Sequence, residues 1–299
     1  MRALITGATG FIGRELVKRL DQPVVLTREP ARAKELLGKV EAYAWDAMTA
    51  PPPAALERVE AVFHLAGDPV AEGRWTAKKK QRIRDSRVIG TRNLVAGLRQ
   101  LGQPPAVLVS ASAIDYYPDH GDEAIDESLP PGTSFLSEVC VAWERESHEA
   151  RQLGIRVVNP RIGIVLGPGG GALSKMLLPF KLGVGGRLGH GRQWMSWIHI
   201  SDVVGLLLHA ASSASVTGAM NATAPNLVTN REFTAALART LHRPAVLPAP
   251  AFGLKLALGE VTDVLLASHR VLPRVAEQTG YAFQYPQLDA ALRAATASA

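Results

Sequence analysis

The chain has 299 residues, of which 47% are hydrophobic and 20% charged, and its formal net charge is +6. This length and composition predict a globular protein built as one elaborated domain or as two coupled ones. The single cysteine, Cys140, excludes an intramolecular disulfide, and no stretch reaches the roughly 18 consecutive apolar residues of a membrane-spanning helix. The first residues, MRALITG, lack the features of a secretory signal. We therefore expect a cytoplasmic protein that makes no membrane contact.

A run of basic residues between Lys78 and Arg87 raises the question of nucleic-acid binding. Apolar Ile83 and Val88 are interleaved with this run, which is the pattern of an amphipathic helix with one solvated face. We therefore expect no nucleic-acid partner. A modest excess of arginine also suits an anionic cofactor.

The first two thirds of the chain alternate between short apolar strands and helices. The pattern begins with a strand at residues 2–6, a glycine turn and a helix at 14–20. Further strands are predicted at 23–27, near 41–45, and at 61–67, 106–112 and 155–167, with helices at 88–101 and 135–154. This alternation predicts an α/β fold, a Rossmann-type doubly wound parallel sheet covered by helices on both faces.

The alternation of strands and helices gives way to glycine-rich segments after about residue 167. Glycine-rich loops within 166–190 are too irregular to build a core and are expected to shape a substrate pocket. Residues 218–224 are expected to return a last strand to the sheet, and the chain from about 231 is largely helical with a proline-rich hinge at 244–252. We expect a nucleotide-binding domain at 1–225 and a smaller, mainly helical substrate region at 226–299.

The glycine turn after the first strand carries the spacing GxxGxxG. Gly7 permits the tight turn, Gly10 lets the backbone approach a pyrophosphate at the start of the helix, and Gly13 allows close helix–strand packing. The alternative, a turn that only connects two elements, is weakened by its place at the first strand of an alternating pattern. The predicted dinucleotide-binding residues of this turn are Gly7, Thr9, Gly10, Phe11, Ile12 and Gly13.

The end of the second strand indicates which dinucleotide is bound. An acidic residue there would accept hydrogen bonds from the adenosine ribose, but this chain has Thr27 and Arg28, followed by Arg32 and Lys34. A guanidinium fits phosphate oxygens in a bidentate way, so Arg28 favours NADP(H) over NAD(H). The alternative is that these are ordinary exposed arginines of a loop.

The motifs GATGFIG, HLAG, IGTRNL and SASA resemble those of the extended short-chain dehydrogenase/reductase superfamily over most of residues 1–225. Several longer motifs resemble those of one atypical subgroup, the epimerase-family or NAD-dependent epimerase/dehydratase-like proteins. These motifs are GDPVAEGRW, SRVIGT, FLSEVC, GGGALSKMLLPFKLGVGG and GRQWMSWIHISD. Members of that subgroup also carry a small C-terminal domain of unknown function, which residues 247–293 resemble. The resemblance implies that Leu65, Ala66, Gly67, Arg87 and Ser137 contribute to the cofactor site.

Members of the superfamily use a serine, a tyrosine and a lysine, often with an asparagine. Lysine and the positive nicotinamide lower the tyrosine pKa, so that the tyrosine exchanges a proton with substrate while hydride moves. By this resemblance Ser112 occupies the serine position and Arg87 the asparagine position, but Phe135 or Leu136 falls at the tyrosine and Cys140 at the lysine. The usual Tyr/Lys pair is absent.

Replacements for the missing pair lie close by in the sequence. The candidate catalytic residues are Ser112, Tyr116, Tyr117 and Cys140, although the tyrosines equally fit packing roles and the thiol fits a buried helix face. By analogy with the superfamily, the substrate side is lined by Trp194, Ser196, Trp197 and His199.

Other catalytic and metal-binding motifs are missing from the sequence. The run GPGGGALSK lacks the ending of a P-loop, and there is no HExxH, CxxC or GxSxG, so no metal site is expected. Two functions stay open: an NADP-dependent oxidoreductase or epimerase-like enzyme acting on a small polar molecule, and a noncatalytic NADP(H)-binding redox-sensing or scaffold protein. The sequence leaves the substrate and the possibility of a homo-oligomer open.

Overall fold

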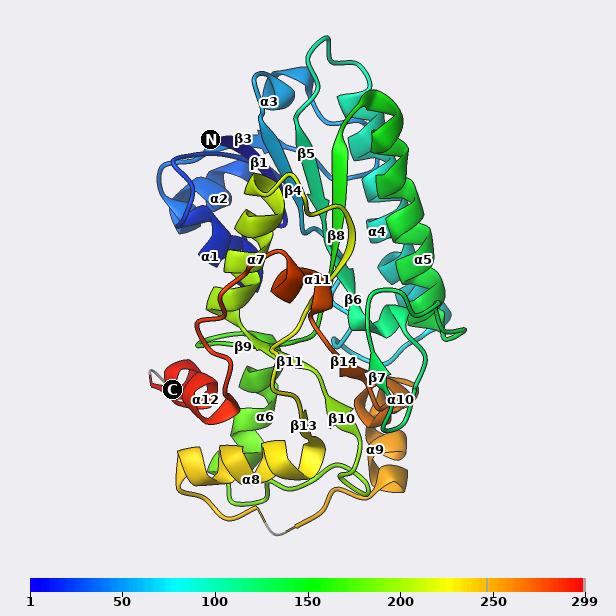
Figure 1. Cartoon of the computed structure of the whole chain (residues 1–299), viewed down its shortest axis with the longest axis vertical. Helices are drawn as coiled ribbons and strands as arrows, with labels where there is room; N and C mark the ends of the chain where they lie inside the picture. Colours follow the sequence, from blue (N-terminus) through cyan, green and yellow to red (C-terminus); the bar gives the residue numbers. More distant parts are fainter. Residues whose placement is uncertain (246, 298–299) are drawn as a thin grey trace.

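A computed structural model describes residues 1–245 and 247–297 and shows a parallel sheet at its centre (Figure 1). The strands run in the order β12-β8-β5-β4-β1-β2-β3, and every neighbouring pair is parallel. Their bounds are β1 (Arg2–Thr6), β2 (Gln22–Thr27), β3 (Glu41–Ala44), β4 (Ala61–His64), β5 (Val107–Ser110), β8 (Arg156–Ile162) and β12 (Gly218–Ala222), and β6 (Ser112–Ala113) pairs with β8. The order reverses beside β1, and in sheets of this kind ligands bind outside the carboxyl ends of the strands at such a point.

Helices cover both faces of the sheet. On one face lie α1 (Phe11–Val17), α2 (Pro30–Leu37) and α7 (Ile200–Ser212), and on the other lie α3 (Pro53–Leu56), α4 (Ala77–Leu98) and α5 (Phe135–His148) (Figure 1). Strands buried on two sides must be apolar throughout, which explains runs such as Val107, Leu108 and Val109. The two faces form two hydrophobic clusters, one on each side of the sheet.

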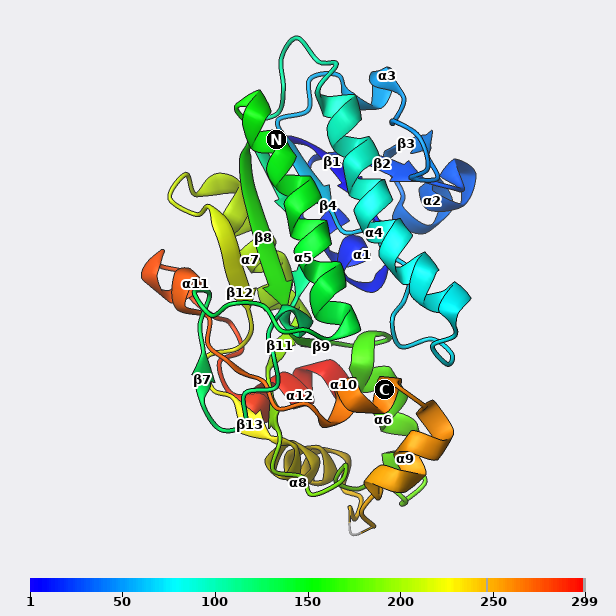
Figure 2. The same cartoon turned by 90° about the vertical axis from the view of Figure 1, so that its right-hand side faces the viewer.

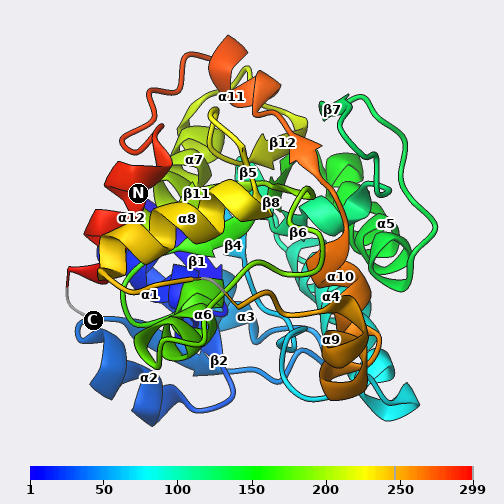
Figure 3. The same cartoon turned by 90° about the horizontal axis from the view of Figure 1, so that it is seen from below.

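A smaller layer closes the end of the sheet to which the parallel strands point (Figures 1 and 2). Its core holds Trp197, Phe233 and Leu292, three fully buried side chains that come from segments far apart in the sequence. Figure 3 shows this layer from below. Its elements are β9 (Ile164–Leu166), α6 (Gly171–Lys181), β10 (Trp194–Met195), β11 (Trp197–His199), β13 (Val228–Thr229), α8 (Asn230–Leu241), α9 (Ala251–Leu258), α10 (Val261–Leu266) and α12 (Leu288–Thr296).

The C-terminal region also returns to the edge of the nucleotide-binding part. Strand β14 (Arg270–Val271) pairs in parallel with β7 (Ala124–Ile125), and α11 (Arg274–Gln278) follows it. Val271 shares a small buried cluster with Ile114 of the 3-10 helix η1 (Ile114–Tyr116). Asp202 of α7 accepts hydrogen bonds from the backbone amides of Gln284 and Tyr285, at 2.7 and 2.9 Å. The predicted region at 226–299 is therefore joined to the rest by shared strands and hydrogen bonds.

The predicted α/β fold is confirmed, and all seven expected strands form. The expected strand at 155–167 divides at Gly163, where an added Cβ would lie 2.3 Å from the Ser196 carbonyl oxygen. The helix expected at 88–101 begins at Ala77 and so includes the basic run, because the Thr76 side chain accepts a hydrogen bond from the Lys79 amide and caps it there. The helix expected at 135–154 ends as an α-helix at His148 and continues as the 3-10 helix η2 (Glu149–Leu153).

Two predicted features extend beyond the described residues. The hinge at 244–252 contains residue 246, and the C-terminal region ends with 298–299, all of which lie outside them. Over 1–245 and 247–297, no helix combines the length and the apolar character required to cross a membrane.

Candidate functional site: a dinucleotide crevice at the carboxyl end of β1

A turn that contains Gly7 and Gly10 joins β1 to α1. Gly7 has φ +70°, and an added Cβ would lie 2.8 Å from the carbonyl carbon of Leu65 on the neighbouring strand end. The Gly10 amide donates to the Gly7 carbonyl at 3.0 Å, and Gly10 caps α1 with no side-chain hydrogen bond. The first amides of α1 are thus left for an anion, which the positive end of the helix dipole favours.

Close packing at Gly13 keeps this turn tight. A Cβ at that position would lie 2.3 Å from the Gly7 carbonyl oxygen and 2.6 Å from the Ala8 Cα. The Phe11 ring is turned away into the glycine-rich loop, where it lies against Gly170. The Phe11 ring therefore packs against that loop, and the glycines keep the turn narrow enough for its backbone to approach a pyrophosphate.

A chain of buried hydrogen bonds runs from this turn to α4. The amides of residues 65–66 donate to Thr6 Oγ1 at 3.2 and 3.1 Å, so the Thr6 hydroxyl proton is left for His64 Nδ1, 2.7 Å away. His64 Nε2 then donates to Thr91 Oγ1 at 2.9 Å, and Thr91 donates to the Arg87 carbonyl at 2.6 Å. Burial, assisted by the charge of Arg87, lowers the His64 pKa to about 4, so the ring is neutral. The chain fixes the end of β4 relative to α4.

Arg87 lies over the end of β4. Its Nη1 donates to the Asp68 carbonyl at 3.0 Å, and its guanidinium carbon lies 3.0 Å from where a Cβ of Gly67 would be. The Trp143 ring lies below it, with 5.1 Å between the guanidinium carbon and the ring centroid. Burial lowers the Arg87 pKa, although nearby Cys140, Asp68 and Asp115 act in the opposite direction.

The end of β2 presents one arginine free of protein partners. Thr27 Oγ1 accepts from the Glu29 amide at 3.3 Å, and Arg32 Nη1 pairs with the Glu29 carboxylate at 3.1 Å. Arg28 is exposed, and no described residue forms a hydrogen bond or ion pair with its side chain. Its guanidinium is therefore free to meet a phosphate beside the ribose end of the crevice.

Ser112 and Tyr117 are brought together, but both hydroxyls have protein partners. Ser112 Oγ donates to Glu144 Oε1 at 2.7 Å, and Arg161 holds both oxygens of the same carboxylate at 2.9 Å each. The Tyr117 hydroxyl donates to Asn221 Oδ1 at 2.7 Å and accepts from Arg161 Nη1 at 2.8 Å. This network joins β6, α5, β8 and β12.

Burial within this network opposes ionisation of the Tyr117 phenol. Burial raises the Tyr117 pKa to about 12, in spite of the positive charge of Arg161. Burial disfavours the charge of Arg161, but the hydrogen bonds and charge of Glu144 outweigh it and raise the Arg161 pKa. Tyr116 lies beside this network with its ring centroid 3.4 Å from the Arg161 guanidinium carbon. Tyr117 is thus a neutral phenol near pH 7.

Cys140 is a buried, neutral thiol. Burial raises its pKa to about 12, and the acidic groups of Asp115 and Glu144 add to that effect. A thiol with this pKa lacks the positive charge that a lysine would bring. Ser137, one turn earlier, donates through Oγ to the Asp115 carbonyl at 2.8 Å and so holds η1 in place.

The structure adds two residues that the sequence did not indicate, Asp115 and His269. Asp115 lies in η1, directly after β6. Burial raises the Asp115 pKa, while the charges of His269 and Arg87 oppose the rise. An acidic residue directly after a strand end was the only sequence signal for Asp115. No signal indicated His269, which comes from the C-terminal region.

Three of the four residues expected on the substrate side are engaged in packing. Trp197 is fully buried and donates through Nε1 to a backbone carbonyl at 3.1 Å, and Ser196 Oγ donates to the His269 carbonyl at 2.6 Å. His199 caps α7 and lies against the Tyr285 ring, with centroids 4.0 Å apart. Trp194 is only half-buried and remains a candidate for ligand contact.

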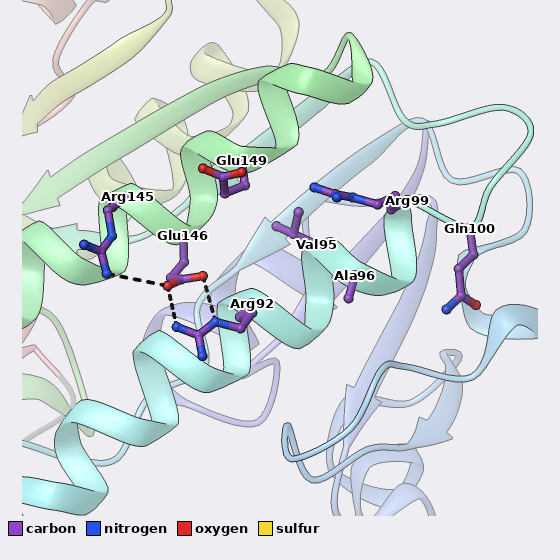
Figure 4. A pocket seen from close by; sticks show the side chains of 8 residues that line it. All are labelled: Arg92, Val95, Ala96, Arg99, Gln100, Arg145, Glu146 and Glu149. Carbon is purple, nitrogen blue, oxygen red and sulfur yellow. Dashed lines mark hydrogen bonds and ion pairs between the residues drawn. The ribbon is translucent and has the colours of Figure 1, made fainter.

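A separate hollow of about 500 Å³ lies between the outer sides of α4 and α5 (Figure 4). Arg92 pairs across it with Glu146, at 2.7 Å. Arg99 and Gln100 mark its far end, where α4 ends before the chain enters β5, so it lies away from the carboxyl ends of the strands. Among the described residues, no group of three His, Cys, Asp or Glu side chains is arranged to hold a metal ion.

The strand order and the glycine turn define a dinucleotide-binding fold of the Rossmann type. A model of the NAD dependent epimerase/dehydratase family matches residues 3–222, and a model of the domain of unknown function DUF1731 matches residues 249–295. The chain belongs to the NAD dependent epimerase/dehydratase family. The predicted resemblance to its epimerase-family subgroup with a small C-terminal domain is confirmed.

Relatives match along nearly the whole chain. An epimerase family protein of Mycobacterium bovis is 40% identical over 298 residues, which cover 98% of this chain and 96% of the relative. The chloroplastic SDR39U1 homolog of Arabidopsis thaliana is 40% identical over 308 residues, covering 98% and 86%. The crystal structure of human epimerase family protein SDR39U1 (isoform2) with NADPH has a TM-score of 0.90 at 32% identity, covering 100% of both chains.

Proposed function

We propose that this protein binds NADP(H) and is an oxidoreductase or epimerase-like enzyme that acts on a small polar molecule. The observation that carries the proposal is the start of α1, where a glycine turn leaves amides free for a pyrophosphate. Arg28, exposed at the end of β2, favours the 2′-phosphate of NADP(H). The human relative solved with NADPH supports the same choice of nucleotide.

We assign the two ends of the cofactor to different residues. The turn from Gly7 to Gly13 would hold the pyrophosphate. The phosphate on the adenosine ribose would be held by Thr27, Arg28 and Arg32. The neighbouring part of the cofactor site would be formed by the strand end at Leu65, Ala66 and Gly67, together with Arg87. When bound, NADP(H) would supply hydride chemistry at its nicotinamide ring. The protein's own residues would orient substrate and move protons.

A noncatalytic NADP(H)-binding role is the second candidate. It is favoured by the hydrogen bonds that occupy the hydroxyls of Ser112 and Tyr117, and by the neutral thiol of Cys140. Of the three predicted catalytic hydroxyl groups, only that of Tyr116 makes no hydrogen bond to a described residue. The catalytic assignment of all four stays a prediction.

We further propose a nucleotide-binding domain at 1–225, a C-terminal region at 226–299 that closes its crevice, and a cytoplasmic location. The pairing of β14 with β7 supports the closing role. The single cysteine fits a reducing compartment.

Calorimetry with NADPH and NADH tests the binding proposal. Heat with NADPH that exceeds the response to NADH is expected, and the absence of heat with both nucleotides would overturn it. A panel of carbonyl compounds and sugar nucleotides, followed at 340 nm, separates the two candidates. Turnover on any of them supports the enzyme, and a silent panel with tight NADPH binding supports the binding protein.

A further inference from the structure

We propose that residues 68–76, which we call the strap, couple the cofactor crevice to the C-terminal region by tying helices α9 and α6 to the end of β4. A nucleotide seated against Gly67 and Arg87 tightens the hold of the strap on these helices, and an intact strap strengthens nucleotide binding in return. The coupling rests on the proposed binding of NADP(H). The contacts between the strap and the helices are formed by the protein alone.

The first residue of the strap is held by residues of the crevice. Arg87 Nη1 donates to the Asp68 carbonyl at 3.0 Å, and the Asp68 amide donates to Ser86 Oγ at 2.9 Å. The Asp68 carboxylate also forms an ion pair with the buried ammonium group of Lys79. The Arg87 guanidinium carbon lies 3.0 Å from where a Cβ of Gly67 would be. Arg87 therefore contacts both the strand end assigned to the cofactor site and the start of the strap.

The second half of the strap is folded against α5. Trp75 Nε1 donates to the Val70 carbonyl at 2.9 Å, which closes the strap into a loop. The Trp75 ring packs edge-on against Phe135 at the start of α5, with centroids 5.4 Å apart. The Lys80 ammonium lies 5.3 Å from the Phe135 centroid and 6.0 Å from that of Trp75, so a cation–π contact adds to the aromatic pair.

Two basic side chains tie this loop to the C-terminal region. Arg74 Nε donates to the Ala257 carbonyl at 3.3 Å, and Arg74 Nη2 donates to the Leu256 carbonyl. Both carbonyls belong to the last turn of α9, where acceptors are left over and the helix dipole favours a cation. Lys80, in the first turn of α4, forms an ion pair with Glu260 between α9 and α10. Figures 2 and 3 show the start of α4 beside α9.

The strap also reaches α6. Lys175 Nζ donates to the Ala71 carbonyl at 2.6 Å. Leu178 and Leu182 follow Lys175 on the same side of the chain's helical turn, and both are exposed. This side of α6 is therefore not held by a core. One loop after β4 thus contacts two helices, α6 and α9, that are far apart in the sequence.

Helix α9 depends on such polar ties because it has no buried residue. Phe252 and Leu256 are 80% and 78% exposed, and Lys255 pairs with Asp263 of the adjoining helix α10. A helix without buried apolar contacts opens at a low free energy. The contacts with the strap therefore decide how firmly α9 is held beside the start of α4.

The hydrogen bond from Arg87 to the Asp68 carbonyl is the point at which cofactor and strap meet. A nucleotide in contact with Arg87 restricts the motion of its side chain and, through this bond, of the start of the strap. A strap that is already ordered loses less conformational entropy when it ties α9, so the two events favour each other. Because coupling between two equilibria is reciprocal, the ties strengthen nucleotide binding by the same factor.

Hydrogen exchange of the full chain, followed by mass spectrometry without nucleotide, tests the ties. Arg74→Ala combined with Lys80→Ala is expected to speed amide exchange in residues 251–258 about 2- to 10-fold, the range that a few exposed polar contacts supply. The matched control combines Lys78→Ala with Arg82→Ala, two exposed residues that make no hydrogen bond or ion pair with a described residue. It should leave exchange unchanged. Equal exchange rates in the two double variants overturn the strap.

A charge exchange tests the ion pair directly. Lys80→Glu places two carboxylates together and should speed exchange in residues 251–258. Adding Glu260→Lys restores a pair of opposite charges and should bring the rate back to within about twofold of that of the unsubstituted protein. If the second substitution does not slow exchange, the tie between Lys80 and Glu260 is wrong.

NADPH tests the coupling. Saturating NADPH should slow exchange in residues 251–258 roughly 2- to 10-fold in the unsubstituted protein, but not in the variant that combines Arg74→Ala with Lys80→Ala. Calorimetry should show that this variant binds NADPH more weakly by the same factor. Absence of NADPH binding to the unsubstituted protein overturns the proposed function and the coupling with it, while the nucleotide-free exchange rates still decide whether the ties exist. NADPH binding that leaves exchange in residues 251–258 unchanged overturns the coupling alone.

Discussion

Arg161 on β8 holds both oxygens of Glu144 on α5, at 2.9 Å each, in the interior of the protein. The side chains of Arg161 and Glu144 are only 5% and 7% exposed. The same two residues bind the hydroxyls of Tyr117 and Ser112, so the ion pair holds the segment after β5 to the sheet and to α5. The position of the segment from Ser112 to Tyr117 therefore depends on this ion pair.

Glu144→Gln should destabilise the protein strongly. The substitution leaves the Arg161 charge buried without a counter-ion, which costs about 3–5 kcal/mol when a buried pair is broken. Urea denaturation gives the free energy of unfolding of the variant and so measures this loss of stability. The control is Asp289→Asn at the exposed pair with Arg239, which should change stability by less than about 0.5 kcal/mol. Equal effects of the two variants would contradict a structural role for the buried pair.

Gly13→Ala should weaken both the fold and nucleotide binding. The new methyl group would lie 2.3 Å from the Gly7 carbonyl oxygen, so the turn must shift, at a cost of about 1–3 kcal/mol. Calorimetry with NADPH should show a reduced affinity, because the amides at the start of α1 move with the turn. Gly102→Ala is the matched control, since nothing lies within 4 Å of its Cβ position. Identical behaviour of the two variants would remove Gly13 from the site.

The sequence predicted those features whose causes are local. Buried parallel strands are apolar throughout, and the turn from Gly7 to Gly13 stands between a strand and a helix, so both could be found from short segments. The arginine at the end of β2 was found in the same way. Element ends were less accurate, as at Gly163, because a carbonyl from a distant loop decides where the strand breaks.

The contacts between distant segments were beyond sequence reasoning. Nothing in the residues around Ser112 shows that its hydroxyl will bond Glu144, or that Arg161 will reach the same carboxylate. His269 directly precedes β14, whose pairing with β7 could not be predicted because two-residue strands have no recognisable sequence pattern. Burial then sets the protonation of Cys140, a property that a sequence does not contain.

His64 should make stability depend on pH below neutrality. Burial lowers the His64 pKa in the folded protein to about 4, compared with 6.5 for an unperturbed histidine side chain. Between these values the unfolded chain binds a proton that the folded protein does not, so the free energy of unfolding falls as pH falls from 6.5 toward 4. By pH 4.5 this contribution should reach about 2–3 kcal/mol.

Urea denaturation of His64→Gln at several pH values isolates that contribution. The variant is expected to lose less stability than the unsubstituted protein between pH 6.5 and 4.5, whatever its stability at pH 7. His242→Gln, at an exposed position, should follow the unsubstituted protein at every pH. Parallel curves for all three proteins would show that His64 is protonated equally in the folded and unfolded states.

Arg28→Asp should reverse the preference between nucleotides. A charge-assisted hydrogen bond to phosphate contributes about 1.5–3 kcal/mol, so its loss should weaken NADPH binding roughly 10- to 150-fold, and the new carboxylate would also repel the 2′-phosphate. NADH carries no 2′-phosphate, and its affinity should hold or rise, because a carboxylate at this strand end accepts hydrogen bonds from the ribose. Calorimetry with both nucleotides gives the ratio of affinities. Arg99→Asp makes the same charge change at an exposed position at the far end of α4 and should leave the ratio unchanged. If Arg28→Asp behaves like Arg99→Asp, Arg28 is an ordinary surface residue and the choice of NADP(H) lies elsewhere in the crevice.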